Sequence, residues 1–225
     1  MSNSSPSIGE IYDTDKSLIL IPIRSFEEGK SRFGAISPHR RRQLIEDLAS
    51  GVVSSIDTTA RRVVVTATSE VGDWAKSLGC QSLVTRSSLN HALREAADEF
   101  GTVGGYGVVM GDIALPSRSF INEALSSRLP LIACDRLRRG TSILHIPFEK
   151  VIDFKFGVDS FKAHLDVIIK NFRVSRVYSA KKESIDIDDF DDLLALQKNS
   201  TLTSIERERI TKMIKMISDG ENIDL

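Results

Sequence analysis

The chain has 225 residues, enough for one α/β domain with a sizeable core, and its 41% hydrophobic and 27% charged residues are typical of globular proteins. The formal net charge of −1 excludes a strong overall attraction to nucleic acid or to an anionic membrane, so any anion must be bound by a local cluster of cations. No apolar run approaches the length of a membrane span.

The N-terminal residues 1–16 are polar and lack the apolar core of a signal peptide, so we expect a disordered tail there. Cys80 and Cys134 are far apart, lack the spacing of metal ligands and lie beside apolar runs. This pattern predicts two buried free thiols in a reduced, cytoplasmic protein. We expect small-molecule partners, with no binding to nucleic acid or to a membrane.

Strand-like and helix-like patterns alternate from residue 17 to residue 198, which predicts a single α/β domain. The apolar runs predict strands at 18–23, 62–66, 82–85, 108–110, 131–134, 142–146 and 175–179, with a short extended piece at 183–187. The amphipathic runs predict a helix that begins at Pro38 and others at 71–78, 89–100, 117–127, 160–171 and 189–197. Such alternation indicates a mostly parallel central sheet flanked by helices on both faces.

Residues 199–225 predict a separate C-terminal amphipathic helical extension. Its apolar side chains recur at helical spacing, at Ile205, Ile210, Met213, Ile214 and Ile217. This helix packs either on its own domain or on a partner chain, and the second arrangement would make a homodimer.

The loop that leaves the first predicted strand holds three cations, Arg24, Lys30 and Arg32. In open α/β sheets, ligands bind just outside the carboxyl ends of the strands. Lys supplies a point charge and Arg a planar fork, and both suit phosphate oxygens. The loop therefore predicts a polyphosphate site, with a solvated basic loop as the alternative.

Gly111-Asp112 lies at the carboxyl end of the strand predicted at 108–110. A Gly there allows close approach, and Mg²⁺ is typically bound by one or two carboxylates plus substrate phosphates. Asp112 is therefore a candidate Mg²⁺ ligand. An N-cap of the next helix is an equally good interpretation of the same residue.

A second group of candidate anion ligands follows the strand at 131–134, where three arginines precede a Gly-Thr-Ser turn. Backbone N–H groups near Gly140 and the hydroxyls of Thr141 and Ser142 suit a phosphate or a carboxylate. The helix that begins with Asp159 or Ser160 as its N-cap is a further anion site or simply a capped helix.

An acidic cluster spans residues 185–192 and begins with strand-like alternation. In extended backbone Asp186 and Asp188 point to the same face, because side chains alternate with a period of two. Either one is a candidate to complete a metal site with Asp112. The later carboxylates are expected to cap a helix or to be solvated: Asp189, Asp191 and Asp192.

Several common catalytic motifs are absent from the sequence. The four histidines share no spacing typical of metal ligands, and none is placed as a general base. The chain also lacks a Walker-type phosphate loop and a G-x-G-x-x-G motif after the first strand. These absences argue against a P-loop NTPase and against a standard dinucleotide dehydrogenase.

Six groups of residues, taken in order over residues 18–196, resemble the 2-phospho-L-lactate guanylyltransferase family of coenzyme F-420 biosynthesis, which includes phosphoenolpyruvate and 3-phospho-D-glycerate guanylyltransferases. The matching groups are Ile21-Pro22-Ile23-Arg24 with Lys30-Ser31-Arg32, Leu89-Asn90-His91-Ala92-Leu93, Gly111-Asp112, Asp135-Arg136 with Gly140-Thr141, Phe156-Gly157 with Ser160-Phe161 and His164, and Asp186-Ile187-Asp188. The specificity of the match comes from their shared order.

The resemblance implies a single-domain α/β nucleotidyltransferase fold, Rossmann-like and of the GT-A type. It implies an enzyme that transfers GMP from GTP to a small phosphorylated acid and releases pyrophosphate, with Mg²⁺ as cofactor. The acid would be 2-phospho-L-lactate, phosphoenolpyruvate or 3-phosphoglycerate. A non-catalytic, nucleotide-binding regulatory relative is the alternative.

The resemblance also implies a role for each matching residue. The residues that contact GTP would be Arg24, Lys30, Arg32 and Asn90, the last near the nucleoside. The catalytic residues would be Lys30, Arg32 and Asp112. The Mg²⁺ ligands would be Asp112, Asp186 and Asp188. The residues that bind the phosphorylated acid would be Arg136, Thr141, Gly157 and Ser160.

The chain departs from the family pattern at several of these positions. Arg24-Ser25 stands where the family usually has Lys-Pro, and residues 112–116 are longer than the family's Asp-Leu-Pro run. Asp159 stands where the family has a second Gly, which places a carboxylate close to the predicted acid pocket. Asp159 either repels an anionic acceptor or caps the helix and points away.

Overall fold

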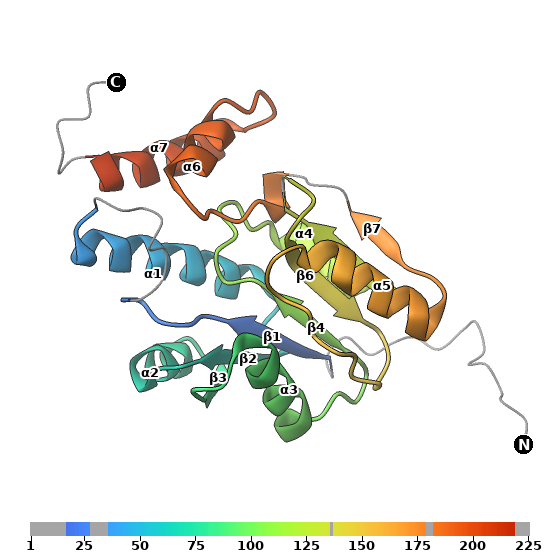
Figure 1. Cartoon of the computed structure of the whole chain (residues 1–225). Coiled ribbons are helices and arrows are strands. Elements are labelled where there is room, and N and C mark those ends of the chain that lie inside the picture. The colour runs from blue at the N-terminus through green and yellow to red at the C-terminus, as the bar shows by residue number, and fades with distance from the viewer. Residues whose placement is uncertain (1–16, 28–35, 136, 179–181, 219–225) are drawn as a thin grey trace, which may run out of the picture.

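The computed structural model describes residues 17–27, 36–135, 137–178 and 182–218. Its strands are β1 (Leu18–Pro22), β2 (Arg61–Thr66), β3 (Gln81–Val84), β4 (Tyr106–Val109), β5 (Leu131–Cys134), β6 (Thr141–Ile146) and β7 (Arg176–Tyr178). They form one sheet in the order β3-β2-β1-β4-β6-β5-β7 (Figure 1). The tail predicted at residues 1–16 lies outside the described residues.

The sheet is mostly parallel, as predicted, and β6 is the exception. β1 pairs in parallel with β2 and β4, β2 with β3, and β5 with β7. β6 is antiparallel to both of its neighbours, β4 and β5. Only residues 135–140 separate β5 from β6, and a parallel crossover needs a dozen or more residues. The short connection therefore makes β5 and β6 a hairpin.

The helices are α1 (Pro38–Ser55), α2 (Ser69–Ser77), α3 (Leu89–Phe100), α4 (Arg118–Leu125), α5 (Ser160–Phe172), α6 (Phe190–Gln197) and α7 (Ser204–Ser218), with a short 3₁₀ helix, η3 (Lys182–Ser184). Their positions agree with the predicted helices. The piece predicted as extended at 183–187 is different, because it begins with η3 and meets another segment only through a bridge between Asp186 and Ile113.

Two hydrophobic cores lie on opposite faces of the sheet, and β1 contributes to both. Ile19 and Ile21 pack with α1, α2 and α4, whereas Leu18 and Leu20 pack with α3 and α5. This division follows from the period-two alternation of side chains along a strand. Every residue of β1 is buried, as expected for a central strand covered on both faces. Cys80 and Cys134 are buried thiols, as predicted.

A third core lies beyond the edge of the sheet, where α6 and α7 pack together and α7 lies against α1 (Figure 1). It buries Ala114 and Leu115 of the loop after β4, Ile185 and Ile187 of the acidic segment, and a set of α7 side chains: Ile210, Met213, Ile214 and Ile217. The C-terminal helix thus packs on its own domain. Within the described residues, no helix is both long and apolar enough to cross a membrane.

Candidate active site

The carboxyl ends of the parallel strands lie at one edge of the sheet, and most of the described candidate residues lie along this edge. The strand order reverses between β1 and β4, because β2 and β3 extend the sheet to one side of β1 and β4 begins the other. Ligands of open α/β sheets bind at such a switch point. Arg24 follows β1 there, and Asp112 follows β4.

The loop after β1 is anchored on both sides of Arg24. The Arg24 carbonyl accepts hydrogen bonds from the Ala67 N–H and from Thr66 Oγ1, each at 3.1 Å. Phe26 is buried and its ring lies perpendicular to that of Trp74, with 5.3 Å between the ring centroids. These contacts leave the Arg24 side chain exposed at the edge. Lys30 and Arg32 lie outside the described residues, so their predicted roles stay predictions.

Gly111 is the residue that lets the end of β4 approach the end of β1. A Cβ on Gly111 would lie 2.8 Å from Ile23 Cγ1 and 2.9 Å from the Pro22 carbonyl oxygen. The structure thus uses this Gly for a close approach between the ends of two strands. The N-cap of α4 is Ser117, whose hydroxyl accepts from the Phe120 N–H. The interpretation of Asp112 as a helix cap is therefore wrong.

Asp186 lies on the backbone segment next to Asp112. Ile113 and Asp186 form an antiparallel bridge, in which the Ile187 N–H donates to the Asp112 carbonyl at 3.2 Å. Asp188 is exposed, and its N–H donates to Asp192 at 3.0 Å. Among the described residues, no three His, Cys, Asp or Glu side chains gather as a metal site. Two carboxylates on neighbouring segments nevertheless fit Mg²⁺, which usually takes most of its ligands from phosphates and water.

The loop between β5 and β6 already binds a carboxylate of its own. Asp135 accepts hydrogen bonds from the Arg139 N–H at 2.8 Å and from the Gly140 N–H at 2.6 Å. The amide of Gly140 is therefore engaged by Asp135 in this structure, and binding of an external anion by the N–H groups near Gly140 stays a prediction. Ser142 also differs from expectation, because it is buried and donates to the Ser184 carbonyl at 2.6 Å. Arg136 lies outside the described residues.

Thr141 and Ser160, both predicted to bind the acid, are brought into contact. The Thr141 N–H donates to Ser160 Oγ at 3.0 Å, and the Ser160 N–H donates to the Gly157 carbonyl at 3.2 Å. Gly157 has φ +134°, a conformation that strongly favours glycine. The structure thus gathers three of the four predicted acid-binding residues around the start of α5.

The buried side chain of His164 contacts Thr141 of this group. The Lys155 N–H donates to His164 Nε2 at 2.9 Å, so Nδ1 carries the proton and donates to Thr141 Oγ1 at 3.0 Å. Burial lowers the pKa of His164 to about 4, so the ring is neutral at pH 7. Both ring nitrogens are occupied, and His164 therefore holds Thr141 in place instead of acting as a base.

Asn90 binds backbone in this structure. Its Nδ2 donates to the Phe156 carbonyl at 3.0 Å, and its Oδ1 accepts from the Phe156 N–H at 2.8 Å. This two-point contact fixes the turn before Gly157 against the start of α3. A contact between Asn90 and the nucleoside stays a prediction, since the amide still has one N–H to offer.

Asp159 lies at the start of α5 without a capping hydrogen bond, and its repulsion of an anionic acceptor stays a prediction. Its carboxylate instead pairs with Arg139, with 3.1 Å between Asp159 Oδ1 and Arg139 Nε. The pair is exposed and connects the loop before β6 to the loop before α5. Because Arg139 balances its charge, Asp159 is a weaker obstacle to an anion than the sequence suggested.

The supporting roles of His164, Asn90 and Asp135 were missed from the sequence. Each acts through a contact between residues that are distant or on different elements, and a single sequence carries no signal for such pairs. His164 offered one indirect clue, because it falls on the apolar face of α5, where a polar ring must find partners.

Comparison with known proteins identifies the family to which this arrangement belongs. The family described as "Guanylyl transferase CofC like" matches residues 17–216. The phosphoenolpyruvate guanylyltransferase of Chloroflexus aggregans is 28% identical over 76% of this chain and 92% of its own length. The 2-phospho-L-lactate guanylyltransferase of Methanocaldococcus jannaschii is 25% identical over 84% of this chain and 86% of its own length.

A solved structure shows the same fold at very low identity. A nucleotidyl transferase from Methanothermobacter is 11% identical and has a TM-score of 0.52 over 88% of this chain and 98% of its own. The α/β nucleotidyltransferase fold expected from the resemblance is therefore confirmed.

Proposed function

The chain belongs to the CofC-like guanylyl transferase family, and on that premise we propose that it transfers GMP from GTP to a phosphorylated three-carbon acid in coenzyme F-420 biosynthesis. The observation that carries this proposal is the arrangement at the carboxyl edge of the sheet. Arg24 and Asp112 lie at the switch point, and the contact between Thr141 and Ser160 lies at the start of β6, on the same edge.

The proposed reaction joins two phosphates and releases a third group. An oxygen of the acid's phosphate attacks the α-phosphorus of GTP, and the bond from that phosphorus to the α,β-bridging oxygen breaks. Pyrophosphate leaves with the bonding electrons, and the acid becomes linked to GMP through a diphosphate. The attacking phosphate is already ionised at neutral pH, because its second pKa is about 6. A general base is therefore unnecessary, which agrees with the neutral, fully engaged His164.

The residues of this chain serve the reaction by positioning and by charge. Arg24, with Lys30 and Arg32 of the same loop, would hold the triphosphate of GTP through charge-assisted hydrogen bonds. Asp112 and Asp186, with Asp188 as a third candidate, would hold Mg²⁺. When bound, Mg²⁺ would neutralise charge on the phosphates that react. Thr141, Gly157 and Ser160, with Arg136, would orient the acid for in-line attack.

The identity of the acid is a separate part of the proposal. The two relatives named above are a phosphoenolpyruvate and a 2-phospho-L-lactate guanylyltransferase. Both acids combine one phosphate and one carboxylate on three carbons, as 3-phosphoglycerate does. We therefore assign this chemical class to the acceptor.

Replacing one hydroxyl tests the placement of the acid. Thr141→Val keeps the shape of the side chain, and loss of one hydrogen bond should raise the KM for the acid about tenfold while the KM for GTP is unchanged. Ser142→Ala is the matched control, because that neighbouring hydroxyl binds the Ser184 carbonyl. Steady-state kinetics of pyrophosphate release measure both variants. If Thr141→Val raised the KM for the acid and the KM for GTP equally, Thr141 would not belong to the acid site. The same conclusion would follow if Ser142→Ala raised the KM for the acid as much as Thr141→Val.

A further inference from the structure

The loop that carries Asp112 is buried almost throughout, which is unusual for a connection between two elements. Ile113 and Ala114 are 0% exposed and Leu115 is 5% exposed. Loops normally lie on the surface, because buried backbone groups must find hydrogen-bond partners. The partners of this loop therefore decide where its backbone lies, and with it where Asp112 lies.

Three carbonyls of the loop accept hydrogen bonds from three different parts of the chain. The Asp112 carbonyl accepts from the Ile187 N–H at 3.2 Å. The Ala114 carbonyl accepts from Arg209 Nε of α7 at 3.1 Å. The Pro116 carbonyl lies 3.1 Å from the hydroxyl of Ser55 at the end of α1. Alternate carbonyls are thus held by the acidic segment, by α7 and by α1.

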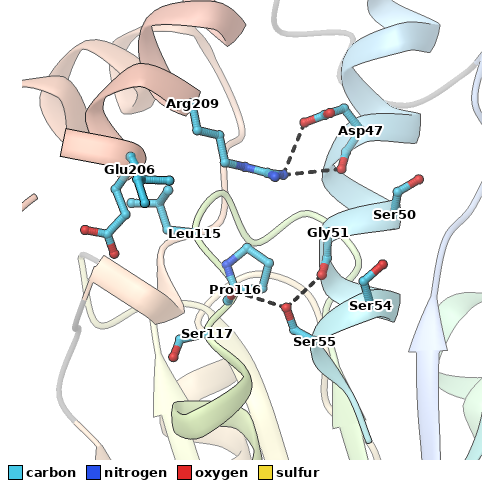
Figure 2. A pocket seen from close by; sticks show the side chains of 11 residues that line it. Asp47, Ser50, Gly51, Ser54, Ser55, Leu115, Pro116, Ser117, Glu206 and Arg209 are labelled. Atoms are coloured by element: carbon cyan, nitrogen blue, oxygen red, sulfur yellow. Dashed lines mark hydrogen bonds and ion pairs between the residues drawn. The ribbon is translucent and has the colours of Figure 1, made fainter. Parts of the chain in front are cut away.

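Arg209 is the only charged donor among these three contacts of the described loop. The same guanidinium also reaches α1, where its Nη2 lies 3.1 Å from Asp47 Oδ2 and 3.4 Å from the Asp47 carbonyl (Figure 2). Hydrogen bonds from a charged donor are roughly twice as strong as neutral ones. One side chain therefore joins α7, α1 and the loop that carries Asp112.

The neighbouring residue on α1 leaves room for this guanidinium. A Cβ on Gly51 would lie 2.7 Å from Arg209 Nη2. Figure 2 shows Arg209 extending from α7 toward Asp47 and Gly51, across a pocket of about 560 Å³ whose other side is formed by Leu115, Pro116 and Ser117. Gly in the middle of a helix lowers helix stability by about 1 kcal/mol relative to Ala. Space for Arg209 is a physical reason for Gly51.

A second contact connects α7 to the segment that carries Asp186. Lys182 of η3 lies 2.6 Å from Glu206 of α7 and donates to the Thr201 carbonyl at 3.1 Å. Ile185 and Ile187, on either side of Asp186, pack in the same core as α7. Helix α7 therefore contacts both segments that carry the predicted metal ligands.

We propose that Arg209 is a positioning residue, which fixes the Ala114 carbonyl and so holds Asp112 in the place where it binds Mg²⁺ with GTP. Helix α7 is then a support of the active site. The metal-binding part rests on the proposed function, whereas the positioning part concerns backbone that can be observed without any substrate.

Arg209→Ala, compared with Arg207→Ala, tests the proposal. Arg207 is the matched control, because its guanidinium binds the carbonyls of Gln197 and Asn199 instead of the loop. Hydrogen exchange on the intact protein should be roughly tenfold faster in peptides covering 113–116 and 185–188 in Arg209→Ala, the effect of losing one charge-assisted hydrogen bond. Arg207→Ala should leave those peptides unchanged.

The kinetic readout is the Mg²⁺ concentration that gives half-maximal pyrophosphate release at saturating GTP. Loss of a residue that orients a metal ligand typically weakens metal binding or activity about 10- to 100-fold. Arg209→Ala should show that shift and Arg207→Ala should not, although urea unfolding detects a loss of stability in both. Absence of turnover in the parent protein would overturn the proposed function, while the exchange result would still decide the positioning role.

Gly51→Ala keeps the proposal falsifiable if Arg209→Ala does not fold. The added methyl should displace the guanidinium while raising the intrinsic stability of α1. We expect faster exchange at 113–116 and a higher half-maximal Mg²⁺ concentration from a protein that folds normally. Parental exchange and a parental Mg²⁺ requirement in a folded Arg209→Ala protein, or in Gly51→Ala where Arg209→Ala does not fold, would overturn the proposal.

Discussion

Gly111 shows how one missing side chain sets the geometry of the candidate site. Its Cα lies so close to the end of β1 that a Cβ would meet the Pro22 carbonyl at 2.9 Å. Gly111→Ala should therefore lower the free energy of unfolding by about 1–3 kcal/mol, the usual cost of overpacking. It should also reduce pyrophosphate release, because Asp112 moves with the backbone.

Gly72→Ala is a matched comparison for this change. Gly72 is also buried, but a Cβ there would meet side-chain atoms, Val84 Cγ2 at 2.9 Å and Ser82 Oγ at 3.3 Å, which are able to move. Urea unfolding and turnover should be affected less than in Gly111→Ala. A Gly111→Ala protein with parental stability and activity would show that the close contact between β1 and β4 is dispensable.

The buried histidines make stability depend on pH. Burial lowers the pKa of both His145 and His164 to about 4, below the value near 6.5 expected in the unfolded chain. The unfolded state therefore binds more protons between these two values, and stability falls as the pH falls through this range. Each histidine should cost on the order of 2 kcal/mol between pH 7 and pH 5.

Urea unfolding at pH 7, 6 and 5 measures this effect. His164→Gln removes one of the two titrating groups, so its stability should decrease less between pH 7 and pH 5 than that of the parent, from a lower value at pH 7. Unfolding free energies that are flat over this range in the parent would contradict the assignment of both rings as buried and neutral.

The sequence predicts candidate site residues more readily than it predicts their hydrogen-bond partners. Asp112, Thr141 and Ser160 were found because each follows a strand or opens a helix, and such positions can be read from local pattern. The resemblance assigned the amide of Asn90 to GTP, and the sequence predicted no contact for the carboxylate of Asp135. Their partners are backbone groups brought close only by the complete fold, such as Phe156 for Asn90.

At the scale of elements, the acidic segment separates into two functions. Asp189 accepts from the Asp192 N–H at 3.0 Å and forms a capping box at the start of α6, as the sequence predicted for these later aspartates. Asp186 lies before this box and beside the loop that carries Asp112. We therefore expect Asp189 to affect stability and Asp186 to affect activity.

Two substitutions separate these functions. Asp189→Ala should lower the free energy of unfolding by about 1 kcal/mol, the usual cost of losing an N-cap, with turnover and Mg²⁺ dependence unchanged. Asp186→Asn should leave stability nearly unchanged and reduce turnover strongly. Thermal or urea unfolding together with pyrophosphate release measures both. The opposite pattern would place the cap at Asp186 and remove it from the metal site.

The orientation of β6 and the start of α7 show where pattern reasoning at this scale falls short. The apolar pattern predicts β6 as a strand, whereas its antiparallel orientation follows from the short connection after β5. The extension predicted over residues 199–225 gave no residue at which its helix begins. The structure uses Thr203, whose hydroxyl accepts from Glu206 N–H while Glu206 accepts from Thr203 N–H at 2.7 Å.

For the whole molecule, the fold could be predicted because each face of each strand carries a consistent signal. β1 shows this in four residues, Leu18 to Ile21, that alternate between two cores. The third core could not be predicted, because it unites α1, α6, α7 and two loops through contacts between residues far apart in sequence. That core contains residues next to Asp112 and Asp186 in the sequence, such as Ala114 and Ile187. The part of the fold that could not be predicted is therefore the part that supports the candidate metal ligands.

The central claim is that this molecule transfers GMP from GTP to a phosphorylated three-carbon acid. Pyrophosphate release with Mg²⁺ and GTP, measured with 2-phospho-L-lactate, phosphoenolpyruvate and 3-phosphoglycerate in turn, tests it most directly. ATP and CTP serve as controls for the base, and Asp112→Asn serves as the control for the site. We predict release with GTP and at least one of these acids, and its loss in a folded Asp112→Asn protein. No release with any pair, from protein that still binds GTP, would contradict the claim.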